Sequence, residues 1–299
     1  MIVPKIDIHV HSAPRKSIPR FWSDGEDYTT PDELRRMYNE LGIEKGVQLP
    51  PITTDCGYHY VSNDDSYEMV KNHPETYDWF CNIDPRWAKN SPDTDLSYFI
   101  RYYQERGAKG VGEITCNLYF DDPRVMNLFY HCEKCEMPVL FHLGDMGNDY
   151  GLVDELGLKR LEKALKAFPN LQFIGHSQKF WAEISGDCTE KVRSGYPEGP
   201  VTPGGRVIAL LRKYPNLTCD LSAGSGGNAV MRDPEFGYAF MEEFQDRLYF
   251  GTDICGPKHY FPLSRYLDEC VESGKITQEA YEKISRKNAL KLLNRKIGK

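Results

Sequence analysis

Short runs of apolar residues recur along the chain at intervals close to the ~30 residues of a strand-helix-strand unit. Each run has the length of a buried strand and is followed by a segment with helical periodicity. The pattern predicts eight strands, at residues 3–10, 45–49, 78–83, 109–114, 138–142, 171–176, 217–221 and 248–253. Because runs of this kind are apolar on both faces, they indicate a parallel sheet covered by helices.

The segments between these runs carry ordinary helix boundary signals. Thr30 precedes a proline and two acidic residues, which predicts the start of a helix that Gly42 would stop. Ser62 and Asp122 predict the N-caps of two further helices, and apolar residues at helical spacing predict a last helix over residues 277–293. Strands and helices therefore alternate along the chain.

Eight such repeats favour a closed (β/α)8 barrel of the α/β class, a TIM barrel, over an open sheet. No stretch of the 299 residues has the composition of a linker, so we expect a single domain over residues 1–299. Two stretches rich in Gly or Pro, 197–205 and 223–227, follow predicted strands. We interpret them as long βα loops that distort the barrel, and the second could offer backbone amides to an anion.

Composition narrows the class of protein. A hydrophobic fraction of 40% supports a sizeable core, and a net charge of -7 would repel a nucleic acid. No run approaches the ~20 apolar residues of a membrane span, and the first residues lack the apolar core of a secretory signal. We expect a cytoplasmic protein that acts on a small molecule, has no membrane or nucleic-acid partner, and can form a homo-oligomer.

The cysteines fit a reducing compartment. They number nine, and most lie in apolar or helical segments, which is typical of reduced core residues. Cys132 and Cys135 form a lone CxxC pair without a second pair or an adjacent histidine. We interpret this pair as two residues of one helix.

The first candidate metal ligands lie at the end of the first predicted strand. Residues i and i+2 of a strand share one face, so Asp7, His9 and His11 are expected to point the same way. Two rigidly presented imidazoles suit zinc or a related ion in a site open to water. Asp7 would lie deeper, either orienting one imidazole or forming part of the barrel floor.

Three other predicted strands end in residues that can bind a metal. His142 closes the fifth strand, His176 the sixth and Asp253 the eighth. Barrel enzymes keep their chemistry at the carboxyl ends of the strands, so these side chains should meet His9 and His11. The sequence therefore predicts a divalent metal site, with zinc as the expected ion.

Glu113 closes the fourth predicted strand and is flanked by glycines. A carboxylate at that rim position can bridge two metal ions, or it can be a salt-bridged residue with no ligand role. One ion and two ions are both compatible with the sequence.

This arrangement of histidines and acids resembles the amidohydrolase superfamily over the whole chain. Residues 7–11 (Asp-Ile-His-Val-His), 251–253 (Gly-Thr-Asp) and 286–289 (Arg-Lys-Asn-Ala) are similar to the branch that includes aminocarboxymuconate-semialdehyde decarboxylase. For single-metal members the resemblance implies four ligands, His9, His11, His142 and Asp253. It would leave His176 to act on the substrate.

The glutamate that closes the fourth strand is instead similar to the two-metal TatD-like deoxyribonucleases and related hydrolases. That resemblance implies a bridging role for Glu113. One ion would then be held by His9, His11 and Asp253, and the other by His142 and His176.

Two reactions and one inactive alternative follow. The first hypothesis is a hydrolase of a small amide, lactone or ester, in which Asp253 takes the proton of a metal-activated water. His176, where it is not a ligand, would stabilise developing negative charge. The alternative is non-oxidative decarboxylation of a small aromatic or unsaturated carboxylic acid by the same residues. A binding protein or inactive barrel is disfavoured, because every expected ligand position is filled.

Residues in the predicted loops are candidates for substrate contact. An anionic substrate would need a cation, for which the candidates are Arg15, Arg20, Arg86 and Arg232. His59 and His259 can reach the rim. Aromatic residues that can wall a pocket for a planar or apolar substrate are Phe21, Trp22, Tyr28, Tyr58 and Tyr60.

Overall fold

The strands of the computed structural model, which describes residues 1–21, 25–260 and 262–295, lie where the apolar runs predict them. They are β1 (Lys5–Val10), β2 (Ile43–Gln48), β3 (Tyr77–Trp79), β4 (Val111–Ile114), β5 (Val139–Gly144), β6 (Leu152–Val153), β7 (Phe173–His176), β8 (Leu217–Asp220) and β9 (Leu248–Tyr249). All the strand pairs are parallel. Among the strands of the described residues, only the two-residue strand β6, which pairs with β5 beside the main path, has no counterpart in the prediction.

Helices follow the strands along the chain. They are α1 (Pro31–Leu41), α2 (Asn63–Asn72), α3 (Ser97–Gln104), α4 (Pro123–Lys134), α5 (Lys159–Ala167), α6 (Gln178–Ala182), α7 (Glu190–Arg193), α8 (Arg206–Lys213), α9 (Ala223–Met231), α10 (Pro234–Glu243), α11 (Leu263–Glu272), α12 (Gln278–Glu282) and α13 (Asn288–Leu293), with a π-helical turn η1 (Lys283–Lys287) between the last two. Thr30, Ser62 and Asp122 stand at the predicted N-caps, and Gly42 ends α1 in the left-handed conformation.

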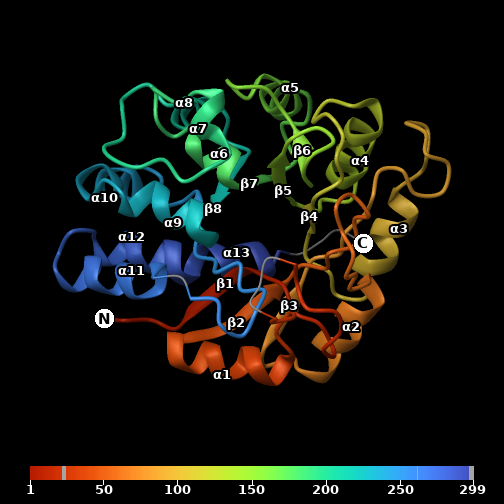
Figure 1. Cartoon of the computed structure of the whole chain (residues 1–299), viewed down its shortest axis with the longest axis horizontal. Coiled ribbons are helices and arrows are strands. Elements are labelled where there is room, and N and C mark those ends of the chain that lie inside the picture. The colour runs from red at the N-terminus through yellow and green to blue at the C-terminus, as the bar shows by residue number, and fades with distance from the viewer. Residues whose placement is uncertain (22–24, 261, 296–299) are drawn as a thin grey trace.

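The strands form a (β/α)8 barrel, with the helices arranged around them (Figure 1). One sheet has the order β1-β2-β3 and the other the order β4-β5-β7-β8-β9. Backbone contacts join the two sheets at both seams. Cys81, just after β3, pairs with Val111 of β4, and Val10 of β1 pairs with Ile254, which follows β9.

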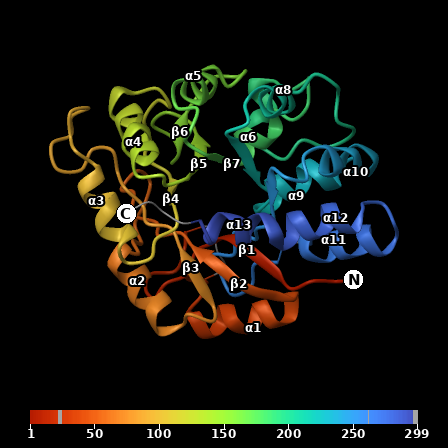
Figure 2. The same ribbon diagram turned by 180° about the vertical axis from the view of Figure 1, so that it is seen from behind.

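The barrel has two apolar layers. Its interior contains residues from several strands, among them Ile6, Ile8, Phe80 and Leu140, and these pack with Leu292 of α13. Helix α13 lies across the barrel next to β1, as the view from behind shows (Figure 2). A larger cluster lies between the outer faces of the strands and the surrounding helices. The amino-terminal end of the barrel is thus filled, and polar side chains collect at the other end.

The prediction of a loop over residues 223–227 is wrong, because this segment begins helix α9. Its glycines allow close packing of the backbone and do not mark a flexible loop. A Cβ atom on Gly226 would lie 2.3 Å from the backbone carbon of Leu221, where the chain leaves β8. Glycine at this position therefore lets α9 start directly against the end of the strand. The other predicted loop, residues 197–205, lies outside helices and strands.

Two expectations from composition can be compared with the structure. All nine cysteines are free, as the sequence predicts, and Cys132 and Cys135 lie in and at the end of α4. Within the described ranges of the chain, no helix combines the length and the apolar character needed to cross a lipid bilayer.

Candidate metal centre

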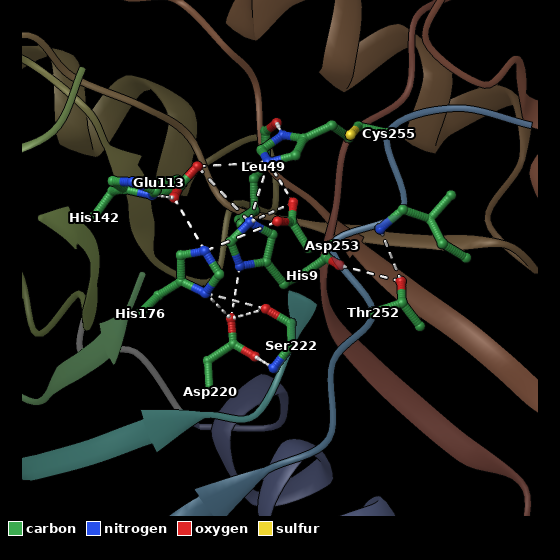
Figure 3. A network of polar contacts seen from close by, with 12 residues as sticks. His9, Leu49, Glu113, His142, His176, Asp220, Ser222, Thr252, Asp253 and Cys255 are labelled. Carbon is green, nitrogen blue, oxygen red and sulfur yellow. Dashed lines mark hydrogen bonds and ion pairs between the residues drawn. The ribbon is translucent and has the colours of Figure 1, made fainter. Parts of the chain in front are cut away.

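The predicted site residues come together at the carboxyl ends of the strands (Figure 3). His9 and His11 come from β1 and the residue after it, and Asp253 follows β9. The Nε2 atoms of His9 and His11 lie 3.0 Å apart, and each lies 3.4 Å from Oδ1 of Asp253. These three side chains form one group whose ligand atoms all lie within reach of a single ion.

Glu113 of β4 lies between this group and two further histidines. Its Oε2 lies 3.7 Å from Nε2 of His9 and 3.5 Å from Nε2 of His11. Its Oε1 lies 2.7 Å from Nδ1 of His142 and 3.6 Å from Nε2 of His176. His9, Glu113 and His176 form a second possible metal-binding group. The two oxygens of one carboxylate thus face two different sets of histidines.

Each imidazole of the central cluster is oriented by a polar contact at its other nitrogen. Nδ1 of His9 lies 2.6 Å from Oδ2 of Asp220, and Nδ1 of His11 lies 2.8 Å from the carbonyl oxygen of Leu49. Nδ1 of His176 lies 3.1 Å from the Ser222 hydroxyl and 3.2 Å from Oδ2 of Asp220. Because these contacts occupy Nδ1, the three rings turn their Nε2 atoms toward one another, as metal-binding histidines do.

The short distances between the carboxylates and the imidazoles determine the protonation states of the cluster. Burial alone would raise the pKa of Asp253, but the positive field of His9 and the hydrogen bond with His11 lower it to about 2. Burial would likewise lower the pKa of His11, yet its contacts with Asp253 and Glu113 raise it to about 10. Asp253 and Glu113 thus stay ionised, and their negative charge favours a cation beside them, either the protonated ring of His11 or a metal ion.

Asp7 does not share the surroundings of the histidines. Its Oδ2 accepts hydrogen bonds from the hydroxyls of Tyr38 in α1, at 2.8 Å, and Thr252, at 2.6 Å. Its Oδ1 accepts from the backbone nitrogens of His9 and Thr252, both at 2.9 Å. The expectation that one face of β1 carries Asp7 and both histidines is therefore wrong. The pairing of β1 with β2 is irregular between Asp7 and Val10, and such an irregularity changes the direction of side chains.

Asp220 and Ser222 were not among the predicted site residues. Asp220 is fully buried at the end of β8, and interaction with His9 and His176 outweighs its burial and holds its pKa below the ordinary range. Ser222 donates a hydrogen bond of 2.7 Å to Oδ2 of Asp220. The sequence did carry a signal for Asp220, because it ends an apolar strand, as the residue rule that identified Asp253 requires.

Replacing Asp220 with asparagine is expected to weaken zinc binding by about 10- to 100-fold, because the imidazoles of His9 and His176 lose the charge that orients them. Competition with a chromophoric chelator measures this affinity. Asp246→Asn is the matched control, since the Asp246 side chain is 70% exposed and pairs with Lys283. Equal affinities for the wild type and Asp220→Asn would contradict the orienting role.

A cavity of about 230 Å³ opens onto the cluster. It exceeds the ~150 Å³ that accommodates a benzene ring, so a small molecule fits. The cluster contributes His11, Glu113, His142 and Asp253 to the lining, and the loops contribute Arg20, Tyr28, Pro50, Pro51, Thr53, Asp55, Cys56, Gly57, Tyr58, His59, Thr115, Tyr150 and Cys255. His9 and His176, which are 0% and 2% exposed, lie behind these residues.

The loop candidates separate into two groups. Arg20, Tyr28, Tyr58 and His59 line the cavity as expected. In the described part of the chain the lining does not extend to Phe21, Tyr60, Arg15, Arg86, Arg232 or His259. Arg86 is held by Asp55 and Asp84, each at 2.6 Å, and His259 contacts Arg20 at 3.2 Å. Trp22 lies outside the described residues.

A family model described as amidohydrolase matches residues 6–295. The chain belongs to the amidohydrolase family. By sequence, no curated protein matches it. The resemblance inferred from the histidines and acids at the strand ends is thereby confirmed at the level of the family.

Solved structures share the fold at low identity. An uncharacterized TIM-barrel protein from Bordetella bronchiseptica is 19% identical, with a TM-score of 0.61 over 97% of this chain and 98% of that one. A probable 2-pyrone-4,6-dicarboxylic acid hydrolase from Acinetobacter baumannii is 11% identical (TM-score 0.59, 98% and 100% covered). A dihydroxybenzoic acid decarboxylase from Polaromonas with bound manganese is 16% identical (TM-score 0.57, 98% and 97% covered). Hydrolases and decarboxylases thus both occur on this architecture.

Proposed function

We propose that the chain is a metal-dependent hydrolase of a small amide, lactone or ester. The observation that carries the proposal is the position of Glu113, whose Oε2 faces His9 and His11 and whose Oε1 faces His142 and His176. A carboxylate between two sets of nitrogen donors is the arrangement of a bridged two-ion site.

The donors of the cluster fit divalent metal ions, zinc among them. Imidazole nitrogens and carboxylate oxygens are preferred zinc ligands, and the contacts at Nδ1 supply the outer-shell support that such ligands need. His9, His11 and Asp253 would hold one ion, and His142 and His176 a second, with Glu113 shared. When bound, such an ion supplies Lewis acidity, which acidifies a water to a pKa of about 7 and polarises a substrate oxygen.

The residues of the chain perform the remaining steps. Asp253 lines the cavity, and its side chain is 24% exposed, so its carboxylate can accept the proton of the attacking water. His176 lies behind the lining, which favours a ligand role over direct contact with the substrate. Tyr28, Tyr58 and Tyr150 supply walls of aromatic surface that exclude bulk water from the reacting atoms.

Metal stoichiometry tests the bridge. Wild-type protein is expected to hold two ions per chain, and Glu113→Ala one or none, because both ions lose a shared anionic ligand. Elemental analysis of protein dialysed against metal-free buffer measures the ratio. Glu105→Ala, at the exposed C-cap of α3, is the control and should retain both ions. A single ion that the Glu113 variant retains would refute the bridge and favour a decarboxylase-like site.

Non-oxidative decarboxylation is the second candidate, because Arg20 lines the cavity and can bind a carboxylate. The two reactions differ in their products. Hydrolysis of a lactone or ester in water labelled with oxygen-18 transfers the label to the acid produced, whereas decarboxylation of a dihydroxybenzoate releases carbon dioxide. Release of carbon dioxide without hydrolysis of any ester or lactone would replace the first proposal with the second.

A further inference from the structure

A second, much smaller cavity lies beside helix α9, and none of the residues of the metal centre line it. Its volume is about 10 Å³, close to what a single particle of the size of a water molecule needs. The lining comes from α6, from α9 and the residue after it, and from the loop over residues 195–197. Helices α6 and α9 pack side by side (Figure 1 and Figure 2). The cavity is therefore a small space between two packed helices and a loop.

One face of α9 supplies the polar side chains of this cavity. Ser225, Asn228 and Arg232 follow one another at intervals of three and four residues, so they lie on the same side of the helix. Ser225 belongs to the first turn of α9, and Arg232 directly follows its last residue. The helix thus brings a hydroxyl, an amide and a guanidinium to one small space.

The loop is held against this face by its own hydrogen bonds. Nδ2 of Asn228 donates to the carbonyl oxygen of Pro197 at 2.9 Å, and Nε2 of Gln178 in α6 donates to the hydroxyl of Tyr196 at 3.2 Å. A Cβ atom on Gly224 would lie 3.1 Å from Cε1 of Tyr196, so glycine there lets the ring approach the helix closely. These contacts use the amides of the lining and do not involve Ser225 or Arg232.

Two side chains of the lining carry buried donors without a partner. Ser225 is 4% exposed, and its Oγ has no hydrogen-bond partner among the described residues. The same holds for Nε and Nη2 of Arg232, which are buried as well. Burying a donor without an acceptor is costly, and burying a charged donor without one costs most. Both side chains therefore favour an acceptor between them.

The charge balance of the cavity favours an anionic acceptor. Among the described residues that line it, Arg232 is the one that carries a formal charge. Burial lowers the pKa of the Arg232 guanidinium and outweighs the fields of Asp187 and Asp233, which raise it. These carboxylates are bound elsewhere, since Asp187 accepts from the Ser185 hydroxyl at 2.5 Å and Asp233 from the backbone nitrogen of Val201 at 2.9 Å. The guanidinium is thus a partly buried positive charge without an ion-pair partner on the cavity wall.

We propose that a chloride ion binds in this cavity, between the hydroxyl of Ser225 and the guanidinium of Arg232. Oγ of Ser225 and Nε and Nη2 of Arg232 donate to the ion, whose charge offsets that of the guanidinium. The volume suits a single monatomic anion, whereas a sulfate, a phosphate or a carboxylic acid needs more space. The bound ion stabilises the packing of α6, α9 and the loop over residues 195–197. This site is independent of the proposed hydrolysis, because no residue assigned to that reaction lines it.

Bromide, which substitutes for chloride and scatters X-rays anomalously, locates the site. Crystals of the zinc-loaded protein in which sodium bromide replaces all chloride should show a bromine anomalous peak within hydrogen-bonding distance of Ser225 Oγ and of Arg232 Nε and Nη2. Crystals of Arg232→Gln should lack this peak. A wild-type cavity that holds a water molecule and gives no bromine signal would overturn the proposal.

Thermal unfolding shows whether the ion also binds in solution. When sodium chloride at about 0.1 M replaces sodium methanesulfonate at the same ionic strength, the Tm of the zinc-loaded wild type should rise by about 2–4 °C. Arg232→Gln should lose this rise, and Ser225→Ala, which removes one donor and little volume, should show a smaller one.

Arg212→Gln is the matched control, because the Arg212 side chain on α8 is 62% exposed and pairs with Glu243. It should keep the full rise in Tm. The control also separates the cavity from chloride bound at zinc or at the surface, since those effects persist in every variant. A wild-type Tm that is equal in the two salts, or a rise that both Arg232→Gln and Ser225→Ala retain in full, would refute the chloride site.

Discussion

Replacing His9 and His11 together with alanine is expected to abolish the binding of divalent metal and to lower turnover by about 10⁴-fold or more. Both residues belong to the group that includes Asp253, and each also lies within 3.7 Å of Glu113. Their loss removes two of the three nitrogens at the centre of the cluster. Elemental analysis measures the bound metal. Steady-state rates with an ester or lactone that the wild-type protein hydrolyses measure the turnover.

The fold of this double variant needs its own check, because His9→Ala leaves the buried Asp220 without one of its imidazole partners. Removing metal from the wild type with a chelator, and restoring activity with zinc, tests the same dependence without a substitution. His73→Ala should keep metal and activity. A double variant that is active without bound metal would contradict the metal-dependent mechanism.

The barrel could be predicted because its signal is local and repeated. Apart from β6, each strand from β1 to β9 lies in an apolar run long enough to predict a buried strand, and capping residues mark the starts of α1, α2 and α4. Helix α9 could not be predicted in this way. Its glycines oppose helix formation by intrinsic propensity, and the close contact of Gly226 with Leu221 outweighs that propensity only in the folded chain.

The candidate site was predictable where a ligand ends a strand, as His142, His176 and Asp253 do, because the barrel brings all carboxyl ends to one rim. Contacts between residues far apart in sequence were not predictable. Asp220 approaches His9 across 211 positions, and Asp27 approaches His59 across helix α1 and strand β2. Strict alternation along β1 also failed, because the irregular pairing after Asp7 depends on the neighbouring strand.

Asp7→Ala is expected to lower the free energy of unfolding by about 3–5 kcal/mol, the largest loss of stability predicted for a single substitution in this chain. The carboxylate is fully buried and accepts four hydrogen bonds, from two backbone nitrogens and two hydroxyls. Alanine leaves these donors buried without an acceptor, at about 1–3 kcal/mol each before relaxation. Urea denaturation measures the difference.

Asparagine at the same position separates hydrogen bonding from simple space filling. In Asp7→Asn the amide oxygen can still accept from the backbone nitrogens of His9 and Thr252, and its NH₂ group can donate to the hydroxyl oxygens of Thr252 and Tyr38. The expected loss is therefore only about 1–2 kcal/mol. Losses of the same size for alanine and asparagine would contradict this account.

The hydrogen bonds of Asp7 also position residues of the metal centre. Oδ1 of Asp7 accepts hydrogen bonds from the backbone nitrogens of His9 and Thr252. His9 is itself a candidate ligand, and Thr252 directly precedes Asp253. Asp7→Ala removes that link between β1 and the segment after β9. We therefore expect weaker zinc binding even in the fraction of Asp7→Ala that stays folded, whereas Asp7→Asn should bind zinc nearly as the wild type does. Zinc affinity unchanged in Asp7→Ala would limit Asp7 to a purely structural role.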